Sequence, residues 1–198
     1  MKRPAFPVLL AASLLAPALL AQNPEKEEKQ LPLEGIQGRE APLLEVDTWI
    51  QLPPGKERVE ITDYPDKIVV MLFFQYKCRA SQEREMPVLK NLVEHYEGQD
   101  GIVFLAIQTT FQEFLDNSAD KLQVVADNFG LSIPFGHSPK LPPKLAGTES
   151  VSMKYLPAGT PWWVIIDRSG KVEYNGHILN EEEAVKGFDR MLAGLPPR

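Results

Sequence analysis

The sequence predicts an α/β fold with a central mixed β-sheet flanked by helices. Two continuous apolar runs are typical of buried strands, amphipathic helical patterns separate and follow them, and a β-hairpin pattern lies near the C-terminal end. Strands joined through helices pair in parallel, whereas the two strands of a hairpin are antiparallel. Both arrangements in one chain therefore predict a mixed sheet.

The first strand and the first helix have the clearest patterns. Residues 68–74 are apolar without alternation, as in a central strand covered on both faces. A helix is expected over 79–96, and Pro87 should kink it because proline displaces a hydrogen bond of the preceding turn. Shorter edge elements are expected at 43–52 and 59–61. The apolar stripe of the helix comprises Val88, Leu89, Leu92, Val93 and Tyr96.

A second strand and helix follow along the chain. We expect a buried strand over 102–108, a helix over 119–129 that ends at Gly130, and a short strand at 133–135. Residues 136–153 then form a long loop with many Pro, Lys and Ser residues. A loop of this length is unusual in a compact domain and indicates a functional or mobile segment.

The C-terminal part predicts a hairpin followed by a helix. The hairpin pairs 162–167 with 171–174 across a short turn. The last helix begins after Asn180, which suits an N-cap and has Glu183 three residues further on. The face that this helix buries comprises Ala184, Val185, Phe188, Met191 and Leu192.

Residues 1–21 have the pattern of a secretory signal peptide, with a basic head, an apolar stretch over 8–20 and small residues near its end. Cleavage is expected after Ala18 or Ala21. The apolar stretch is shorter than the roughly 20 residues that span a bilayer. We therefore expect a periplasmic or secreted protein without stable membrane insertion after cleavage. An uncleaved signal that anchors the chain is the alternative.

The mature chain is expected to consist of a flexible tether over 22–40 and one domain over 41–195. The whole sequence has 21 basic and 27 acidic residues, for a formal net charge of −6, and signal cleavage removes two of the basic residues. An acidic chain lacks the cationic surface that phosphate contacts need. We therefore expect no nucleic acid among its partners.

The chain has one cysteine, Cys78, placed between the expected strand 68–74 and the expected helix 79–96. It cannot form an intramolecular disulfide. An exported protein gains nothing from an idle thiol, because oxidants in that compartment modify or cross-link it. Position and compartment together indicate a thiol that reacts, and a small inert side chain at the end of a strand is the alternative.

The order of elements and three short motifs resemble the thioredoxin superfamily over residues 42–192. The motifs are Phe73-Phe74-Gln75 before the cysteine, Met86-Pro87 in the first helix, and Thr160-Pro161 before an apolar strand that ends in Asp167-Arg168-Ser169-Gly170. More narrowly, the chain is similar to exported thiol-disulfide oxidoreductases related to the cytochrome-maturation proteins and to the redoxin and peroxiredoxin-like group. The resemblance implies that the Pro161 peptide bond is cis, that it faces the sulfur, and that Thr160 and Pro161 line a substrate groove.

The active-site turn departs from the pattern of that superfamily. Most members have tryptophan and then two cysteines, whereas this chain has Lys77 and then Cys78-Arg79-Ala80-Ser81. A dithiol releases its own mixed disulfide, but a lone thiol must wait for an external thiol. Ser81 occupies the place of the second cysteine, and its hydroxyl is expected to donate a hydrogen bond to the thiolate.

Electrostatics near the helix start should favour the ionised form of Cys78. A helix N-terminus carries unpaired amide donors and partial positive charge. Lys77 and Arg79 flank the sulfur and act in the same direction. Glu83 and Glu85 oppose them, but we expect both to be exposed and largely screened.

These features predict a monothiol thiol-disulfide oxidoreductase whose partner is a thiol- or disulfide-containing protein or a small thiol. No cofactor is expected. A metal site is not expected either, because His95, His137 and His177 show no ligand spacing.

Two other functions stay open from the sequence. A one-cysteine peroxidase would, by family resemblance, have Thr or Ser three residues before the cysteine and Pro further upstream, but here Gln75 and Met71 hold those places. A binding module would instead keep the groove around Pro161 and hold an extended peptide without chemistry at Cys78.

Overall fold

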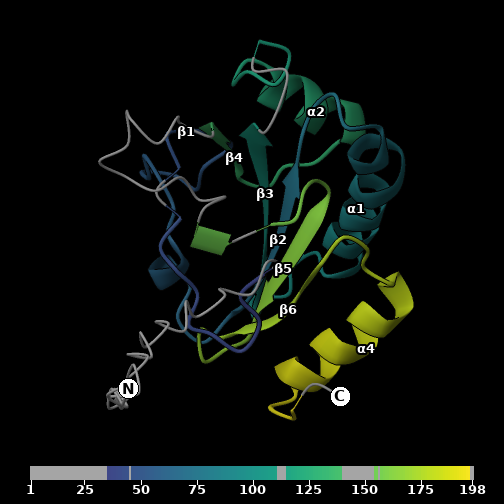
Figure 1. Ribbon diagram of the computed structural model, residues 1–198. Helices are drawn as coiled ribbons and strands as arrows, with labels where there is room; N and C mark the ends of the chain where they lie inside the picture. The colour runs from purple at the N-terminus through teal and green to yellow at the C-terminus, as the bar shows by residue number, and fades with distance from the viewer. Residues whose placement is uncertain (1–34, 45, 111–114, 140–153, 156, 197–198) are drawn as a thin grey trace, which may run out of the picture. The chain divides into compact units, whose positions relative to one another are not determined.

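The computed structural model describes residues 35–44, 46–110, 115–139, 154–155 and 157–196 (Figure 1). The predicted signal peptide, the cleavage sites and most of the predicted long loop lie outside the described residues. The described chain contains a six-stranded mixed sheet. In sheet order its strands are β1 (Thr48–Ile50), β4 (Phe135–Pro139), β3 (Ile102–Thr110), β2 (Ile68–Phe74), β5 (Trp162–Ile166) and β6 (Val172–Gly176).

Strand pairing confirms the predicted α/β class. The pairs β2–β3 and β3–β4 are parallel, whereas β1–β4, β2–β5 and β5–β6 are antiparallel. The antiparallel β5–β6 pair is the predicted hairpin. The parallel pairs are joined through helices, as the alternation of strand and helix patterns predicted.

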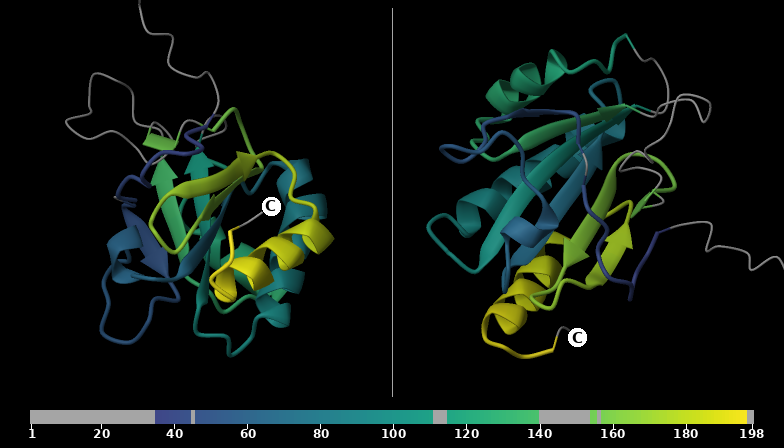
Figure 2. Two further views of the ribbon diagram at one scale, coloured as in Figure 1. Left: turned by 90° about the horizontal axis from the view of Figure 1, so that it is seen from below. Right: turned by 90° about the vertical axis from the view of Figure 1, so that its left-hand side faces the viewer.

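Helices cover one face of the sheet and irregular chain covers the other. The helices α1 (Met86–His95), α2 (Lys121–Phe129) and α4 (Glu181–Leu192) contribute to a single core cluster. Figure 2 shows them on one side of the strands, with the N-terminal segments in blue on the other. The second cluster lies on that other face and includes Leu44, Val59 and Tyr155.

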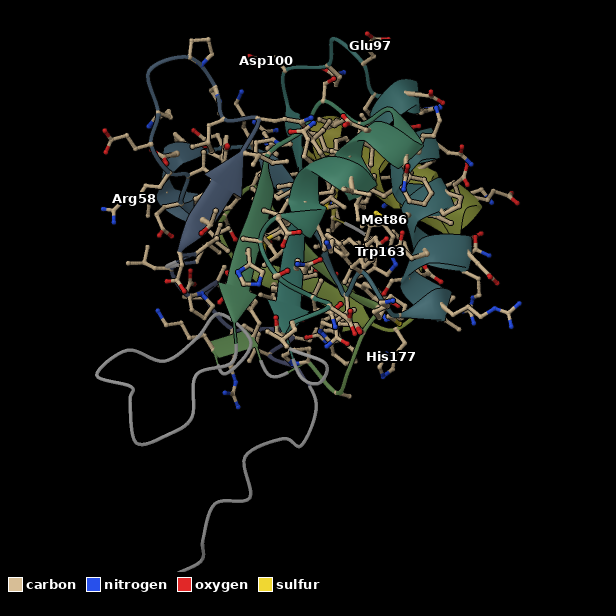
Figure 3. All side chains as sticks on the ribbon, turned by 90° about the horizontal axis from the view of Figure 1, so that it is seen from above. Arg58, Met86, Glu97, Asp100, Trp163 and His177 are labelled. Carbon is tan, nitrogen blue, oxygen red and sulfur yellow. The ribbon has the colours of Figure 1, made fainter. Side chains whose placement is uncertain are left out.

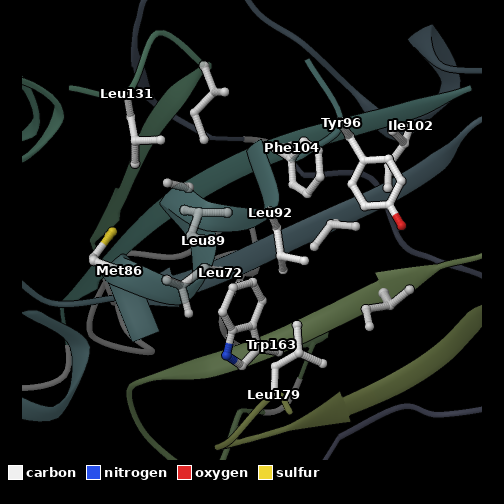
Figure 4. Packing of buried hydrophobic residues seen from close by; sticks show 14 of the residues in the cluster. Leu72, Met86, Leu89, Leu92, Tyr96, Ile102, Phe104, Leu131, Trp163 and Leu179 are labelled. Atoms are coloured by element: carbon white, nitrogen blue, oxygen red, sulfur yellow. The ribbon is translucent and has the colours of Figure 1, made fainter. Parts of the chain in front are cut away.

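Strand β2 supplies side chains to both clusters and is buried at every position, as its sequence predicted. Successive strand residues point to opposite faces. The residues on the helical face are Ile68, Val70, Leu72 and Phe74, and those on the other face are Val69, Met71 and Phe73. Burial of each large apolar side chain stabilises the fold by about 1.5–3 kcal/mol. Strand β2 therefore contributes to the stability of both core clusters. Figure 4 shows part of the helical-face cluster.

The first helix departs from a regular α-helix just before its proline. A π-helical segment spans Ser81–Glu85 and leads directly into α1. Pro87 has no amide hydrogen to donate to the preceding turn. The Met86 amide donates instead to the Ser81 carbonyl, five residues back. A widened turn is therefore present beside the position where we expected a kink.

Residues 35–40, which the sequence assigned to the tether, lie along strand β6. The Gly38 amide donates to the Val172 carbonyl at 2.7 Å, and the Val172 amide donates to the Arg39 carbonyl at 2.9 Å. Ile36 is only 3% exposed. The outer edge of β6 offers unpaired backbone groups, so this segment completes the sheet edge and buries an apolar side chain.

Several element boundaries also differ from expectation. Strand β3 continues past 108 to Thr110, and strand β4 starts at Phe135 rather than 133. Residues Ile61–Asp63 form a 3₁₀ turn where part of a short strand was expected. The extension of β3 consists of buried polar residues, which an apolar pattern does not detect.

The last helix begins as predicted. Its N-cap is Asn180, whose side-chain oxygen accepts a hydrogen bond from the Glu183 amide at 3.0 Å. Within the described part of the chain, no helix is both long enough and apolar enough to cross a bilayer.

Candidate active site

Cys78 lies at the point where a tight turn becomes a helix. Its amide donates to the Gln75 carbonyl at 3.1 Å, and this bond closes the turn. Its carbonyl accepts from the Gln82 amide at 3.1 Å, and this is the first hydrogen bond of the helix. The first residue assigned as helical is Arg79. The thiol therefore sits at the helix N-terminus, as predicted, and the residue is partly buried.

The sulfur faces the loop that precedes strand β5. The peptide bond between Thr160 and Pro161 is cis, as the resemblance implied. The Cys78 thiol donates to the Thr160 carbonyl, with a distance of 3.2 Å between Sγ and oxygen. The structure thus brings together the cysteine and the two residues expected to line a substrate groove, although they are 82 positions apart.

The charged groups of Lys77 and Arg79 interact with side chains other than Cys78. The Lys77 ammonium lies 5.9 Å from the centre of the Tyr76 ring. Arg79 is exposed and pairs with Glu83 at 2.7 Å. Neither side chain forms a hydrogen bond with Cys78 among the described contacts. Their influence on the sulfur is therefore a field through solvent, which salt screens.

Ser81 is fully buried in the first turn after the cysteine. Its hydroxyl has no hydrogen-bond partner among the described residues, so the expected bond to Cys78 is not present. The side-chain nitrogen of Gln75 is another buried polar atom of this region without a partner there. Unpartnered buried polar groups are uncommon in folded proteins and often mark functional regions.

Glu85 is buried, contrary to the expectation that it would be exposed and screened. The residue is 2% exposed. Its carboxyl group accepts from the Trp163 indole at 2.7 Å and lies 3.3 Å from the Arg84 guanidinium. Glu85 is four residues before Leu89, on the apolar stripe of the helix, and this spacing was the signal that could have revealed its burial.

His177 also contacts the cis-proline loop and was not selected from the sequence as a site residue. Its Nδ1 is 2.8 Å from the Pro161 carbonyl oxygen, so this nitrogen carries the donated proton. The imidazole also meets the Trp162 ring edge to face, with 4.8 Å between centroids. His177 itself is labelled in Figure 3. No periodic pattern links His177 to Cys78, and only the hairpin brings it to this loop.

Asn117 is a second contact that the sequence did not suggest. Its side-chain oxygen accepts from the Lys77 amide at 3.0 Å, next to the cysteine. Residue 117 lies between strand β3 and helix α2, in a stretch without apolar periodicity. In the part of the chain that is described, no three His, Cys, Asp or Glu side chains gather as metal ligands would.

Comparisons with known proteins identify the fold. No family model and no curated protein matches this sequence. Among solved structures, the chain is similar to thioredoxin-like superfamily protein SPOA0173, with a TM-score of 0.68 and 19% identity over 80% of this chain and 99% of that one.

Two other similar structures belong to proteins described by a thiol-disulfide chemistry. A putative protein disulfide isomerase from Bacteroides thetaiotaomicron gives a TM-score of 0.61 and 24% identity over 80% of this chain and 91% of that one. A putative thiol:disulfide interchange protein DsbE from Chlorobium tepidum gives a TM-score of 0.56 and 18% identity over 80% of this chain and 99% of that one. At these identities the likeness shows that the fold is thioredoxin-like.

Proposed function

We propose that this protein is exported and carries out thiol-disulfide exchange through the single nucleophile Cys78. The observation that carries the proposal is the position of the sulfur, at a helix N-terminus and 3.2 Å from the carbonyl of a cis-proline loop. A helix N-terminus favours the thiolate. The likeness in fold to a putative disulfide isomerase and to a putative disulfide interchange protein is consistent with this chemistry.

The first step is attack by the Cys78 thiolate on a disulfide of the partner. A new bond forms between Sγ and one sulfur of that disulfide, and the second sulfur leaves as a thiolate. The Ser81 hydroxyl, buried and without a partner among the described residues, is proposed to donate to the thiolate before attack. Thr160 and Pro161 form the groove wall, and Lys77 and Arg79 add positive charge.

The second step needs an external thiol, because the chain has one cysteine. That thiol attacks the mixed disulfide, forms a disulfide with the departing partner and returns Cys78 to the thiolate. Electrons balance over the two steps, since one disulfide is exchanged for another. The protein would therefore act as a carrier of mixed disulfides, and a small thiol or a protein thiol would complete each cycle.

Intact-mass analysis tests the first step. We expect wild-type protein incubated with oxidised glutathione to gain one glutathione at Cys78, and a reductant to remove it. Cys78→Ser should gain none. If Cys78 stays free during the incubation, the proposed chemistry is wrong and a role as a binding module is favoured.

Restoring a second thiol tests the missing step. Wild-type protein should be nearly inactive in insulin reduction driven by a dithiol, because it cannot expel its own mixed disulfide. Ser81→Cys places a thiol in the first helical turn and should raise the rate. A variant no faster than wild type would contradict the assignment of Ser81 to the place of a resolving cysteine.

A further inference from the structure

The turn that carries Cys78 forms hydrogen bonds with two side chains outside it, and the Asn117 side chain is the one that binds its central amide. The turn spans Gln75 to Cys78 and is closed by the bond between the Cys78 amide and the Gln75 carbonyl. Its central amide belongs to Lys77 and donates to the side-chain oxygen of Asn117 at 3.0 Å. In a four-residue turn, the direction of this central peptide distinguishes one turn type from another. The Asn117 oxygen therefore selects one orientation of the peptide next to the cysteine.

Asn117 is itself fixed by three donors that converge on its backbone carbonyl. These are Gln108 Nε2 at 3.0 Å, Thr110 Oγ1 at 3.2 Å and His137 Nε2 at 3.0 Å. Gln108 and His137 are also paired directly across strands β3 and β4. Gln108 and Thr110 come from the C-terminal part of β3 and His137 from the middle of β4, so all three donors stand on paired strands of the sheet.

The cluster is buried, which makes its hydrogen bonds costly to break. Gln108 and Asn117 are 0% exposed, Thr110 is 1% exposed and His137 is 9% exposed. A buried polar group that loses its partner costs more than the bond itself contributes. The cluster therefore fixes Asn117 relative to strands β3 and β4, and Asn117 in turn fixes the position of the turn relative to these strands.

We propose that Asn117 is the positioning residue of this active site, which holds the Lys77 peptide so that the Cys78 thiol faces the Thr160 carbonyl. The expected effect of Asn117 on the rate of mixed-disulfide formation rests on the proposed thiol chemistry. The effect of Asn117 on the Lys77 peptide can be measured without that chemistry, by amide hydrogen exchange. In this scheme Asn117 does not take part in the chemical step, and its effect on the thiol passes through the Lys77 peptide of the turn.

Three variants in the full chain test the proposal. Asn117→Ala removes the acceptor, Asn117→Asp keeps an oxygen in its place, and Asn128→Ala makes the same change at an exposed position of α2. We expect Asn117→Ala to speed amide hydrogen exchange at Lys77 on the order of tenfold, with β2 and β5 unchanged. Asn117→Asp should restore protection, and Asn128→Ala should behave like wild type.

The same variants should change the reactivity of Cys78. The rate of mixed-disulfide formation with oxidised glutathione should fall on the order of tenfold in Asn117→Ala and largely recover in Asn117→Asp. If Asn117→Ala does not fold, Thr110→Val removes one donor to the Asn117 carbonyl and should give smaller changes of the same sign.

The two proposals fail in different ways. Unchanged Lys77 exchange and an unchanged rate in Asn117→Ala would overturn the positioning role, as would faster exchange spread evenly over the sheet. A wild-type Cys78 that never reacts would instead overturn the thiol chemistry, while the exchange at Lys77 would still decide the role of Asn117.

Discussion

At the scale of single residues, the pair Glu85 and Trp163 shows how a buried carboxyl group is tolerated. The indole nitrogen donates to the carboxyl oxygen at 2.7 Å, and the Leu179 amide lies 3.5 Å from the same oxygen. A buried acidic group without donors would be strongly unfavourable. Figure 4 shows Trp163 in the cluster beneath the helices, close to Leu72 and Leu179.

Replacing the indole of this pair should destabilise the protein. Trp163→Phe removes the donor to Glu85 and leaves a small void, so we expect a loss of about 3 kcal/mol in the free energy of unfolding, measured with urea. Trp162→Phe is the matched control, because Trp162 is also buried but its indole nitrogen has no partner among the described residues. Equal losses in the two variants would show that the hydrogen bond to Glu85 contributes nothing.

At the scale of elements, helix α2 ends through backbone conformation and not through a long-range contact. Gly130 follows the helix with φ 64°, in the left-handed region that favours glycine. Its amide donates to the Asp127 carbonyl at 3.2 Å. A Cβ at this position would meet nothing within 4 Å, so the cost of any other residue is conformational.

A pair of glycine substitutions separates these effects. Gly130→Ala should lower the free energy of unfolding by about 1 kcal/mol, because alanine disfavours positive φ. Gly187 lies inside α4, and a Cβ added there would also meet nothing within 4 Å. Gly187→Ala should therefore raise the free energy of unfolding by about 0.5–1 kcal/mol, because alanine has the higher helix propensity. Urea unfolding measures both, and the prediction is wrong if the two changes have the same sign.

At the scale of the whole molecule, we expect the polar cluster around His137 to make stability depend on pH. Burial lowers the pKa of His137, while its hydrogen bond to the Asn117 backbone and the charges of Asp47 and Asp120 act in the opposite direction. The ordinary pKa of histidine is about 6.5. As pH falls below this value, His137 takes up a proton in the unfolded chain before it does so in the folded protein. The stability associated with the neutral ring is therefore complete above that pH and is lost below it.

Unfolding experiments at two pH values check this expectation. Between pH of about 7.5 and 5.5, wild type should lose stability, by at most about 1.4 kcal/mol for each pH unit below the unfolded pKa. His137→Gln keeps a side-chain donor but does not titrate, so its loss over the same range should be smaller. Parallel curves for the two proteins would assign the pH dependence to other groups.

Local patterns in the sequence were sufficient for much of this protein. The unbroken apolar run 68–74, the N-cap Asn180 and the single cysteine at a helix start each depend on neighbours within a few residues, and the structure has all three as predicted. Their physical basis is short-range, because strand burial, capping and turn closure are determined by adjacent side chains and backbone groups.

Tertiary structure decided most of the long-range contacts made by the cysteine turn and by the helix that follows it. The contacts of Cys78 with Thr160, of Lys77 with Asn117, and of Glu85 with Trp163 join residues 82, 40 and 78 positions apart. Only the first was expected, because a family motif accompanied it. Polar residues such as Asn117 carry no periodic signal, and their burial is stabilised by specific partners that the sheet brings together. The sequence by itself therefore determined most of the elements and the place of the single thiol at a helix start, whereas the packed sheet determined which groups hold the turn that carries it.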